Sequence, residues 1–209
     1  MKYRFSFSIF FFCFFTLVNY QADAQVQRFK AGLVLGVNAA QINGDASAGF
    51  NKLGLQGGLR GVVVINDKVE ISTELLFSQR GARNNLVGPS ANFNDLRLNF
   101  VEIPAIFNFK DWYLEDLDFY KFNFYAGLSF GRLISSTTNN IVWEPFLIQF
   151  NKNDFSWLAG ATFYTRPNLG FGLRYTRFIT RLYKPALTGP GLALPLRSFF
   201  LTFQAVYMF

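Results

Sequence analysis

The sequence contains no histidine and a single cysteine, Cys13. Without histidine, the chain cannot build a Ser-His-Asp triad, a histidine-ligated zinc site or a histidine general base. Because Cys13 lies in an apolar run near the N-terminus, removal of that run would also exclude disulfides, thiolate metal sites and a cysteine nucleophile. Only carboxylate, Ser-Lys or tyrosine chemistry would remain open to an enzyme, and the sequence shows no cluster suited to it.

Long apolar runs are missing as well. The run Phe5–Val18 is shorter than the ~20 residues that a membrane-spanning helix needs. It follows a basic start and precedes Ala22-Asp23-Ala24, the order found in a cleaved signal peptide, with a transmembrane anchor as the alternative. We predict a signal peptide over 1–24 and one exported domain over 25–209.

Charge and aromatic content are both high. The net charge is +7 and aromatic residues make up 19%, including 28 phenylalanines. A basic chain often binds nucleic acid, but an exported one has little access to it. The favoured partners are therefore anionic lipid headgroups and lipopolysaccharide, with no partner as the alternative, and no nucleic acid is expected.

Alternating apolar and polar residues dominate what remains. In "LGLQGGLRGVVVI" (53–65) and "KVEISTELLFSQR" (68–80), apolar residues recur at every second position, which indicates β-strands. Short and long connections alternate, an arrangement typical of outer-membrane barrels, and an even strand count places both termini on the periplasmic side. The strands are expected at 29–39, 52–65, 68–80, 96–109, 119–133, 155–165, 169–180 and 198–209.

One strand is irregular. Leu96, Leu98 and Phe100 share one parity, whereas Val101, Ile103, Phe107 and Phe109 share the other. A bulge near Phe100–Pro104 would restore a single apolar face, and Pro104 cannot donate to a ladder in any case.

An eight-stranded barrel could be a soluble ligand-binding protein with its apolar face inside, or a membrane protein with that face in lipid. The polar face is rich in glycine, as a narrow interior requires, and it carries charges of both signs. We therefore predict an all-β, eight-stranded antiparallel up-and-down transmembrane barrel. Its lumen would hold a salt-bridge network, with an ion or solute path as the alternative; the charges assigned to the polar parity are Arg60, Glu70, Glu74, Arg80, Arg132 and Arg174.

The last strand, 198–209, carries apolar residues at alternating positions up to Phe209. This ending resembles the signal that barrel-assembly machinery reads on outer-membrane proteins. Phe203, Tyr207 and Phe209 would form that signal, and Tyr207 and Phe209 would lie in an aromatic girdle at the membrane interface.

Several segments resemble the small outer-membrane β-barrel family of Bacteroidetes that is often called PorT-like. "ISTELLFSQRGA" (71–82) is the most specific match, and "LNFVEIPAIFNF" (98–109) and "FYAGLSFGRLIS" (124–135) also resemble family strands. The resemblance implies an outer-membrane barrel, and it does not imply an enzyme, a cofactor or catalytic residues; we therefore expect no enzyme activity and no cofactor. It also implies structural roles: Glu74, Glu102 and Arg80 would pair inside the barrel, Pro104 would shape the bulge, and Gly81 would end its strand.

Three functions remain open. The first is a non-enzymatic scaffold, envelope-assembly or secretion-associated component. One namesake member of the family is needed for type IX protein secretion, but the resemblance does not by itself give this chain that role. Such a component would act through long loops with Trp143, Phe146, Leu147, Leu192 and Leu194, which could instead cap the barrel. The second is a narrow passive, porin-like channel for small solutes or ions. The third, a membrane enzyme, is disfavoured because Glu70 and Glu74 lie ~13 Å apart along a strand.

The segment "DWYLEDLDFYK" (111–121) is acidic and aromatic. It could be a periplasmic turn with girdle aromatics or a contact for a periplasmic or inner-membrane partner. The sequence does not separate these two interpretations.

Overall fold

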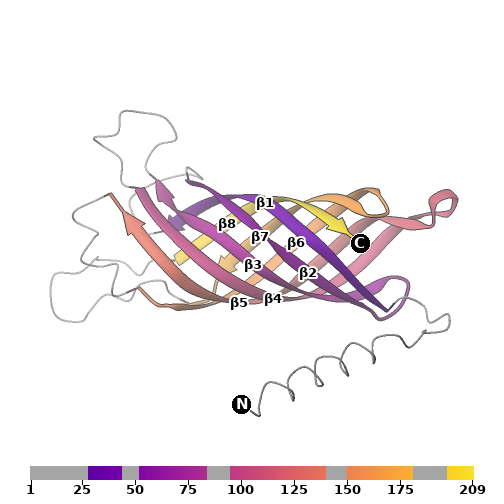
Figure 1. Ribbon diagram of the computed structural model, residues 1–209, viewed down its shortest axis with the longest axis horizontal. Helices are drawn as coiled ribbons and strands as arrows, with labels where there is room; N and C mark the ends of the chain where they lie inside the picture. Colours follow the sequence, from indigo (N-terminus) through magenta and orange to yellow (C-terminus); the bar gives the residue numbers. More distant parts are fainter. Residues whose placement is uncertain (1–27, 44–51, 84–94, 140–149, 181–196) are drawn as a thin grey trace, which may run out of the picture.

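The structure is a computed structural model that describes residues 28–43, 52–83, 95–139, 150–180 and 197–209. Its strands form one closed antiparallel barrel in which each strand pairs with its neighbour in the sequence (Figure 1). The predicted architecture is therefore confirmed. The strands are β1 Phe29–Asn43, β2 Lys52–Val64, β3 Val69–Arg83, β4 Asp95–Leu114, β5 Phe119–Thr138, β6 Asn153–Arg166, β7 Leu169–Phe178 and β8 Arg197–Met208.

The barrel closes where β1 pairs with β8. Their ladder runs from Gly32 opposite Met208 to Asn43 opposite Arg197, so both strands have partners on both sides. A closed sheet leaves no free strand edge, which is a requirement for a barrel that crosses lipid.

Tight turns join β2 to β3 and β6 to β7, and we call the end where they lie the short-turn end. In the first turn, the side-chain oxygen of Asn66 accepts hydrogen bonds from the backbone N–H groups of Lys68 and Val69, at 3.0 and 2.9 Å. This is the local bonding that makes asparagine a turn residue.

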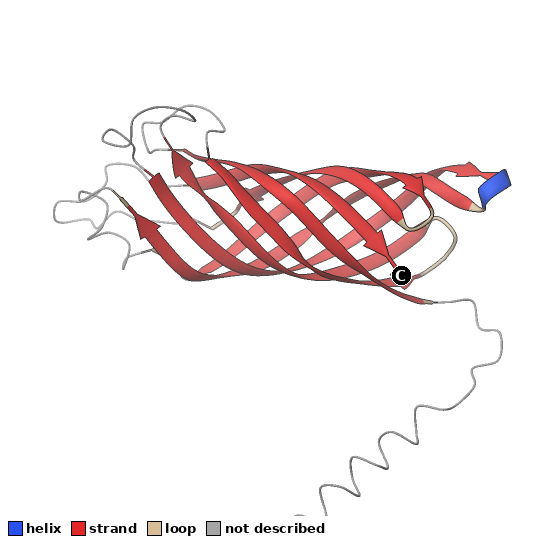
Figure 2. Cartoon of the chain, turned by 45° about the horizontal axis from the view of Figure 1, so that its top comes forward, coloured by secondary structure: helices blue, strands red, loops and turns tan. Residues whose placement is uncertain are grey.

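A longer hairpin joins β4 to β5 at the same end. It carries the 3₁₀ turn η3 (Glu115–Leu117), and it projects beyond the other strands (Figure 2). β4 and β5 pair with each other as far as Leu114 and Phe119. The pairing of β4 with β3 begins at Phe109, and that of β5 with β6 begins at Phe122, so the strands in the outer part of this hairpin pair only with each other.

The two faces of the sheet differ sharply in polarity. On β5, outward-facing Leu128 is 63% exposed, whereas its inward-facing neighbour Ser129 is 2% exposed. The same alternation runs through the other strands, with apolar side chains outside and polar ones inside. A large apolar exterior of this kind is stable only in contact with lipid or protein. Among the described residues, no helix has the length and hydropathy to cross a bilayer.

Strand β4 corrects one prediction. Its inward face includes Leu96, Leu98 and Phe100, and its register against β3 is the same on both sides of Pro104. The register shift lies in the β4–β5 ladder instead, where Asn99 pairs with Ser135 and Phe100 with Leu133. The extra residue is therefore on β5, and Pro104 shapes no bulge on β4.

Gly81 also differs from expectation, because it lies inside β3 and does not end it. It pairs with Arg97 of β4, and a Cβ atom there would overlap the carbonyl oxygen of Leu96. Its backbone φ is +156°, which L side chains rarely adopt. Close approach of two strands explains this glycine.

Candidate functional site: the barrel lumen

The inward face of β3 gives the order of the lumen from the short-turn end to the opposite end. This face carries charged and polar residues and one apolar residue, and all of these side chains are buried. In chain order they are Glu70, Ser72, Glu74, Leu76, Ser78 and Arg80.

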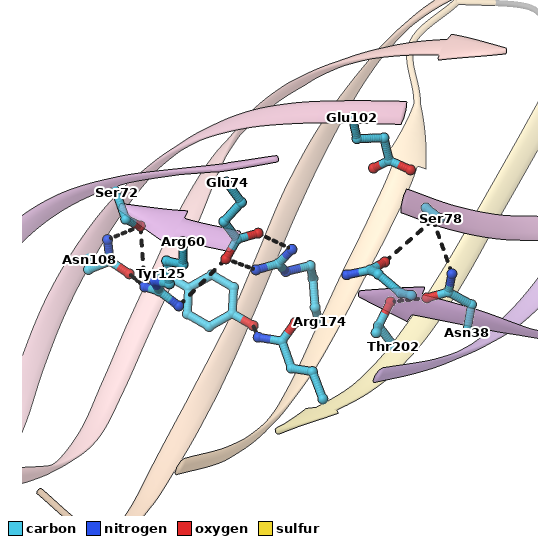
Figure 3. A network of polar contacts seen from close by, with 12 residues as sticks. Asn38, Arg60, Ser72, Glu74, Ser78, Glu102, Asn108, Tyr125, Arg174 and Thr202 are labelled. Atoms are coloured by element: carbon cyan, nitrogen blue, oxygen red, sulfur yellow. Dashed lines mark hydrogen bonds and ion pairs between the residues drawn. The ribbon is translucent and has the colours of Figure 1, made fainter. Parts of the chain in front are cut away.

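Glu74 is the centre of a charged layer that crosses the lumen (Figure 3). Its carboxylate accepts two hydrogen bonds from Arg174 of β7, at 2.8 and 2.9 Å. Arg60 of β2 lies on its other side, with Nη1 3.6 Å from Oε1 of Glu74. We call Arg60, Glu74 and Arg174 the Glu74 layer. All three side chains are nearly inaccessible to solvent, so the layer obstructs the barrel.

Neutral side chains hold the two arginines of this layer in place. Arg60 donates through Nη2 to Asn108 Oδ1 at 2.7 Å and to Ser72 Oγ at 3.2 Å. The guanidinium of Arg174 lies 5.4 Å from the centre of the Tyr125 ring. Gln204 of β8 donates to the Tyr125 hydroxyl at 3.1 Å. Bidentate and networked contacts of this kind fix arginine geometry.

A neutral cluster follows beyond Leu76. Asn38 of β1 donates to Ser78 Oγ at 3.1 Å and accepts from Thr202 of β8 at 2.7 Å (Figure 3). Arg80 also donates through Nε to Ser78 Oγ at 3.1 Å. The cluster thus connects the β1–β8 closure to the next charged group.

Arg80 occupies a cage of phenyl rings. Its guanidinium carbon lies 3.9 Å from the ring centre of Phe200, 4.8 Å from Phe178 and 5.0 Å from Phe100. Such cation–π contacts are most favourable where water is excluded, and Arg80 is 1% exposed. We call these four residues the Arg80 cage.

Two carboxylates neutralise the charge of the cage. Arg80 donates through Nη2 to Glu102 Oε1, and its Nη1 lies 4.0 Å from Asp154 Oδ2. Asp154 in turn accepts from the Thr180 hydroxyl at 2.5 Å. The cage is therefore a second closed section of the lumen.

The predicted network is three separate groups. Arg60, Glu74 and Arg174 meet in one, and Arg80 and Glu102 in another. Glu70 belongs to a third, near the short-turn end, where it is 2.9 Å from Lys110 and 3.4 Å from Lys30.

The prediction that Arg132 faces the lumen is wrong. It shares the parity of Phe124, Leu128 and Phe130, all of which face outward, and it is itself exposed. It donates to Asn153 Oδ1 at 3.3 Å on the outer side of the barrel. Side chains alternate between the two faces along β5, and this alternation places Arg132 on the outer face.

A cavity of about 670 Å³ opens at the short-turn end. Its walls include Lys30, Glu70, Lys110 and Tyr164, and Arg60 of the Glu74 layer also lines it. We call it the mouth cavity. The described residues thus form a lumen that is hollow at this end and closed further in.

Most neutral members of these groups were not singled out from the sequence. Asn38, Ser72, Asn108 and Thr202 are small polar residues that occur in many loops, so their type carries no signal. Their positions do carry a signal. Each of these residues lies on the same face of the sheet as the inward-facing charged residues of its own strand or of the neighbouring strands.

The remaining predicted residues lie elsewhere. Phe203, Tyr207 and Phe209 face outward, and the rings of Tyr207 and Phe209 make an edge contact at 5.7 Å. The predicted signal peptide at 1–24 lies outside the described residues, as do the predicted loop residues Trp143, Phe146, Leu147, Leu192 and Leu194. Within the described strands and turns, no group of acidic side chains could hold a metal ion.

An apolar exterior and a closed, charged interior define a transmembrane β-barrel. Residues 19–183 match the family described as "Outer membrane protein beta-barrel domain", so the chain belongs to this family and is a protein of the outer membrane. A search of curated proteins found no match.

Similar solved structures are small outer-membrane barrels. The attachment invasion locus protein Ail of Yersinia pestis is 13% identical, with a TM-score of 0.47 over 86% of this chain and 98% of that one. Neisserial surface protein A is 14% identical, with a TM-score of 0.47 over 86% and 96%. The N-terminal barrel domain of Pseudomonas aeruginosa OprF is 12% identical, with a TM-score of 0.41 over 88% and 100%. Similarity at this level carries no functional argument.

Proposed function

We propose that this protein is a non-enzymatic, non-conducting scaffold of the outer membrane that acts through the segments projecting from its barrel. The observation that carries the proposal is the closed lumen. The Glu74 layer and the Arg80 cage each fill the barrel with buried, paired side chains. An interior of eight strands is just wide enough for side chains to fill, so these layers leave no continuous path for solutes.

The projecting hairpin supports a role in contacts. Trp112 is 58% exposed and Leu117 is 61% exposed, beyond the paired part of the barrel. Lys121 lies 5.5 Å from the ring of Trp112, and that ring stacks on Phe122. An ordered, partly apolar hairpin outside the barrel suits a periplasmic partner, and the long loops of the other end would serve an external one.

We also propose a narrower family, a role in the envelope and a route to the membrane for this protein. The segment 71–82 supports a PorT-like barrel of Bacteroidetes, with an envelope-assembly or secretion-associated role. Lipid, including lipopolysaccharide, would cover the apolar exterior. Barrel-assembly machinery would insert the chain, with Phe203, Tyr207 and Phe209 of the last strand as its signal. A cleaved signal peptide at 1–24 would direct its export.

The test combines conductance with cross-linking. We expect the purified barrel to give no channel steps in planar bilayers. A photoreactive residue at Leu117 in the native membrane should capture one stoichiometric envelope protein, whereas the same residue at lipid-facing Leu59 should not. Reproducible single-channel steps would overturn the proposal in favour of the narrow channel, for which the mouth cavity is the supporting observation.

A further inference from the structure

Two arginines interrupt the apolar exterior of the barrel. Arg132 of β5 and Arg177 of β7 are both exposed on the outer face, toward the end opposite the short turns. On each strand, the outward residues two positions before and two positions after the arginine are aromatic or aliphatic; they are Phe130 and Ile134 on β5, and Tyr175 and Ile179 on β7. Both arginines therefore lie within the lipid-facing surface. A charge there is unfavourable unless it lies near the headgroups.

No carboxylate of the protein compensates these two charges. Among the described side chains, none forms an ion pair with Arg132 or Arg177. Arg132 donates through Nη1 to Oδ1 of Asn153 at 3.3 Å, which is a neutral acceptor. The neighbouring carboxylate, that of Asp154, is buried in the lumen, where it faces Arg80. The two guanidinium groups are thus available to an anion outside the barrel.

Strand β6 lies between the two arginines and sets their separation. Arg132 pairs with Asn153 of β6, and Arg177 pairs with Trp157 of the same strand. These positions are four residues apart, which is roughly 13 Å along the strand, with two strand spacings of about 4.8 Å across it. Arginine side chains are long, so a headgroup with two anionic groups a disaccharide apart can contact both.

Aromatic rings surround the arginines on the outer face. The rings of Phe130 and Phe155 lie 5.2 Å apart, and those of Trp157 and Tyr175 lie 5.3 Å apart. Tyr175 also lies 6.3 Å from Phe199 of β8. Aromatic side chains of this kind gather where acyl chains meet the headgroups of a membrane. Their presence beside the arginines places this surface at the level of lipid phosphates.

We propose that the outer face of β5, β6 and β7 binds lipopolysaccharide through the phosphate groups of its disaccharide headgroup. Arg132 and Arg177 each donate to one phosphate, for which the planar guanidinium group is well suited. The aromatic rings contact the acyl chains below it. In the proposed orientation, this end of the barrel lies in the outer leaflet, where lipopolysaccharide is found.

This inference rests on the proposed lipid contact of the exterior and assigns it to particular residues. It does not involve the projecting hairpin or the closed lumen. Cross-linking at Leu117 and conductance therefore still test the scaffold, whatever the lipid measurements give.

Native mass spectrometry of the full barrel in non-ionic detergent measures the binding. We would titrate the protein with bisphosphorylated lipid A, which is the lipid of lipopolysaccharide, with dephosphorylated lipid A, and with phosphatidylglycerol. The bisphosphorylated lipid should form a saturable one-to-one complex. The other two lipids should bind about tenfold more weakly or less, because each lacks the paired phosphates.

Two variants and a matched control make the result specific. Arg132→Gln and Arg177→Gln should each weaken binding of the bisphosphorylated lipid about tenfold, since each loses one charge-assisted contact. Arg166→Gln removes an exposed arginine at the other end of β6, and it should change the affinity by less than about twofold. If one variant lacks the heat-modifiable band of a folded barrel, the other still decides.

Three results would overturn the proposal. The first is equal binding of lipid A with and without its phosphates, which would leave only apolar contact. The second is equally tight binding of phosphatidylglycerol, which would mean that any anionic lipid suffices. The third is an unchanged affinity in both arginine variants, or the same loss in Arg166→Gln, which would mean that the phosphates bind elsewhere on the barrel.

Discussion

Glu74 is the residue on which the interior depends most directly. It is 2% exposed and lies between two arginines, so its removal leaves two buried cations without a carboxylate. Breaking a buried ion pair costs far more than the pair itself contributes, because the remaining charge has lost its only compensation.

We therefore expect Glu74→Gln to lower the free energy of unfolding by about 3 kcal/mol. Urea titration in lipid vesicles, read by the heat-modifiable shift on gels, measures it. Glu74→Gln combined with Arg174→Met should recover part of the loss. Glu115→Gln, at the exposed turn η3, is the control and should be neutral. Equal stability of Glu74→Gln and wild type would contradict the paired layer.

At this scale, much of the lumen could be predicted from the sequence. Strict alternation places Arg60, Glu74 and Arg174 inside, and the structure brings them together. What alternation cannot give is the partner, because pairing across the lumen depends on how far each strand is displaced against its neighbours. Glu70 and Arg80 share the face of Glu74, yet they belong to other groups.

Among the elements, β2 shows how glycine sets the spacing of strands. Gly58 faces inward, and a Cβ atom there would overlap the carbonyl oxygen of Leu75 on β3. Gly61 faces outward, and a Cβ atom there would meet nothing within 4 Å. Gly58 and Gly61 thus lie on the same strand, but only at Gly58 would a larger residue collide with the neighbouring strand.

Gly58→Ala should therefore destabilise the barrel by about 2 kcal/mol, because β2 and β3 would have to separate. Gly61→Ala should leave it unchanged or slightly more stable. Unfolding in urea compares the two directly. If both variants unfold at the same urea concentration, the strand contact at Gly58 is not as close as the structure indicates.

Strand β4 shows a limit of predicting the inner and outer faces from the alternation of apolar and polar residues. The rule of an apolar outside and a polar inside fails at Leu98 and Phe100, since this part of the interior is itself aromatic. The sequence records an apolar residue but not what it packs against. The phenyl rings of the Arg80 cage come from β4, β7 and β8, and no pattern within one strand predicts that these rings are in contact with Arg80.

For the molecule as a whole, the two closed sections act in series. The Glu74 layer and the Arg80 cage lie at different depths, separated along β3 by Leu76 and Ser78. A solute that passed one would still meet the other, so the barrier does not depend on either alone.

Single variants that open one section, Glu74→Ala or Arg80→Ala, should therefore remain silent in planar bilayers. The double variant Glu74→Ala/Arg80→Ala should show small conductance steps, provided that it still gives the heat-modifiable band of a folded barrel. Conductance from either single variant would mean that one section alone closes the lumen.

The pairing of β1 with β8 has a consequence for the kinetics of folding. All other ladders connect strands that follow each other in the chain, but this one unites groups as distant as Asn38 and Thr202, which are 164 residues apart. The entropy of bringing such distant segments together is lost before any of their contacts form. Until that last step, every partly assembled sheet has two open edges that can pair with other chains, so the rate of closure decides between a finished barrel and an aggregate.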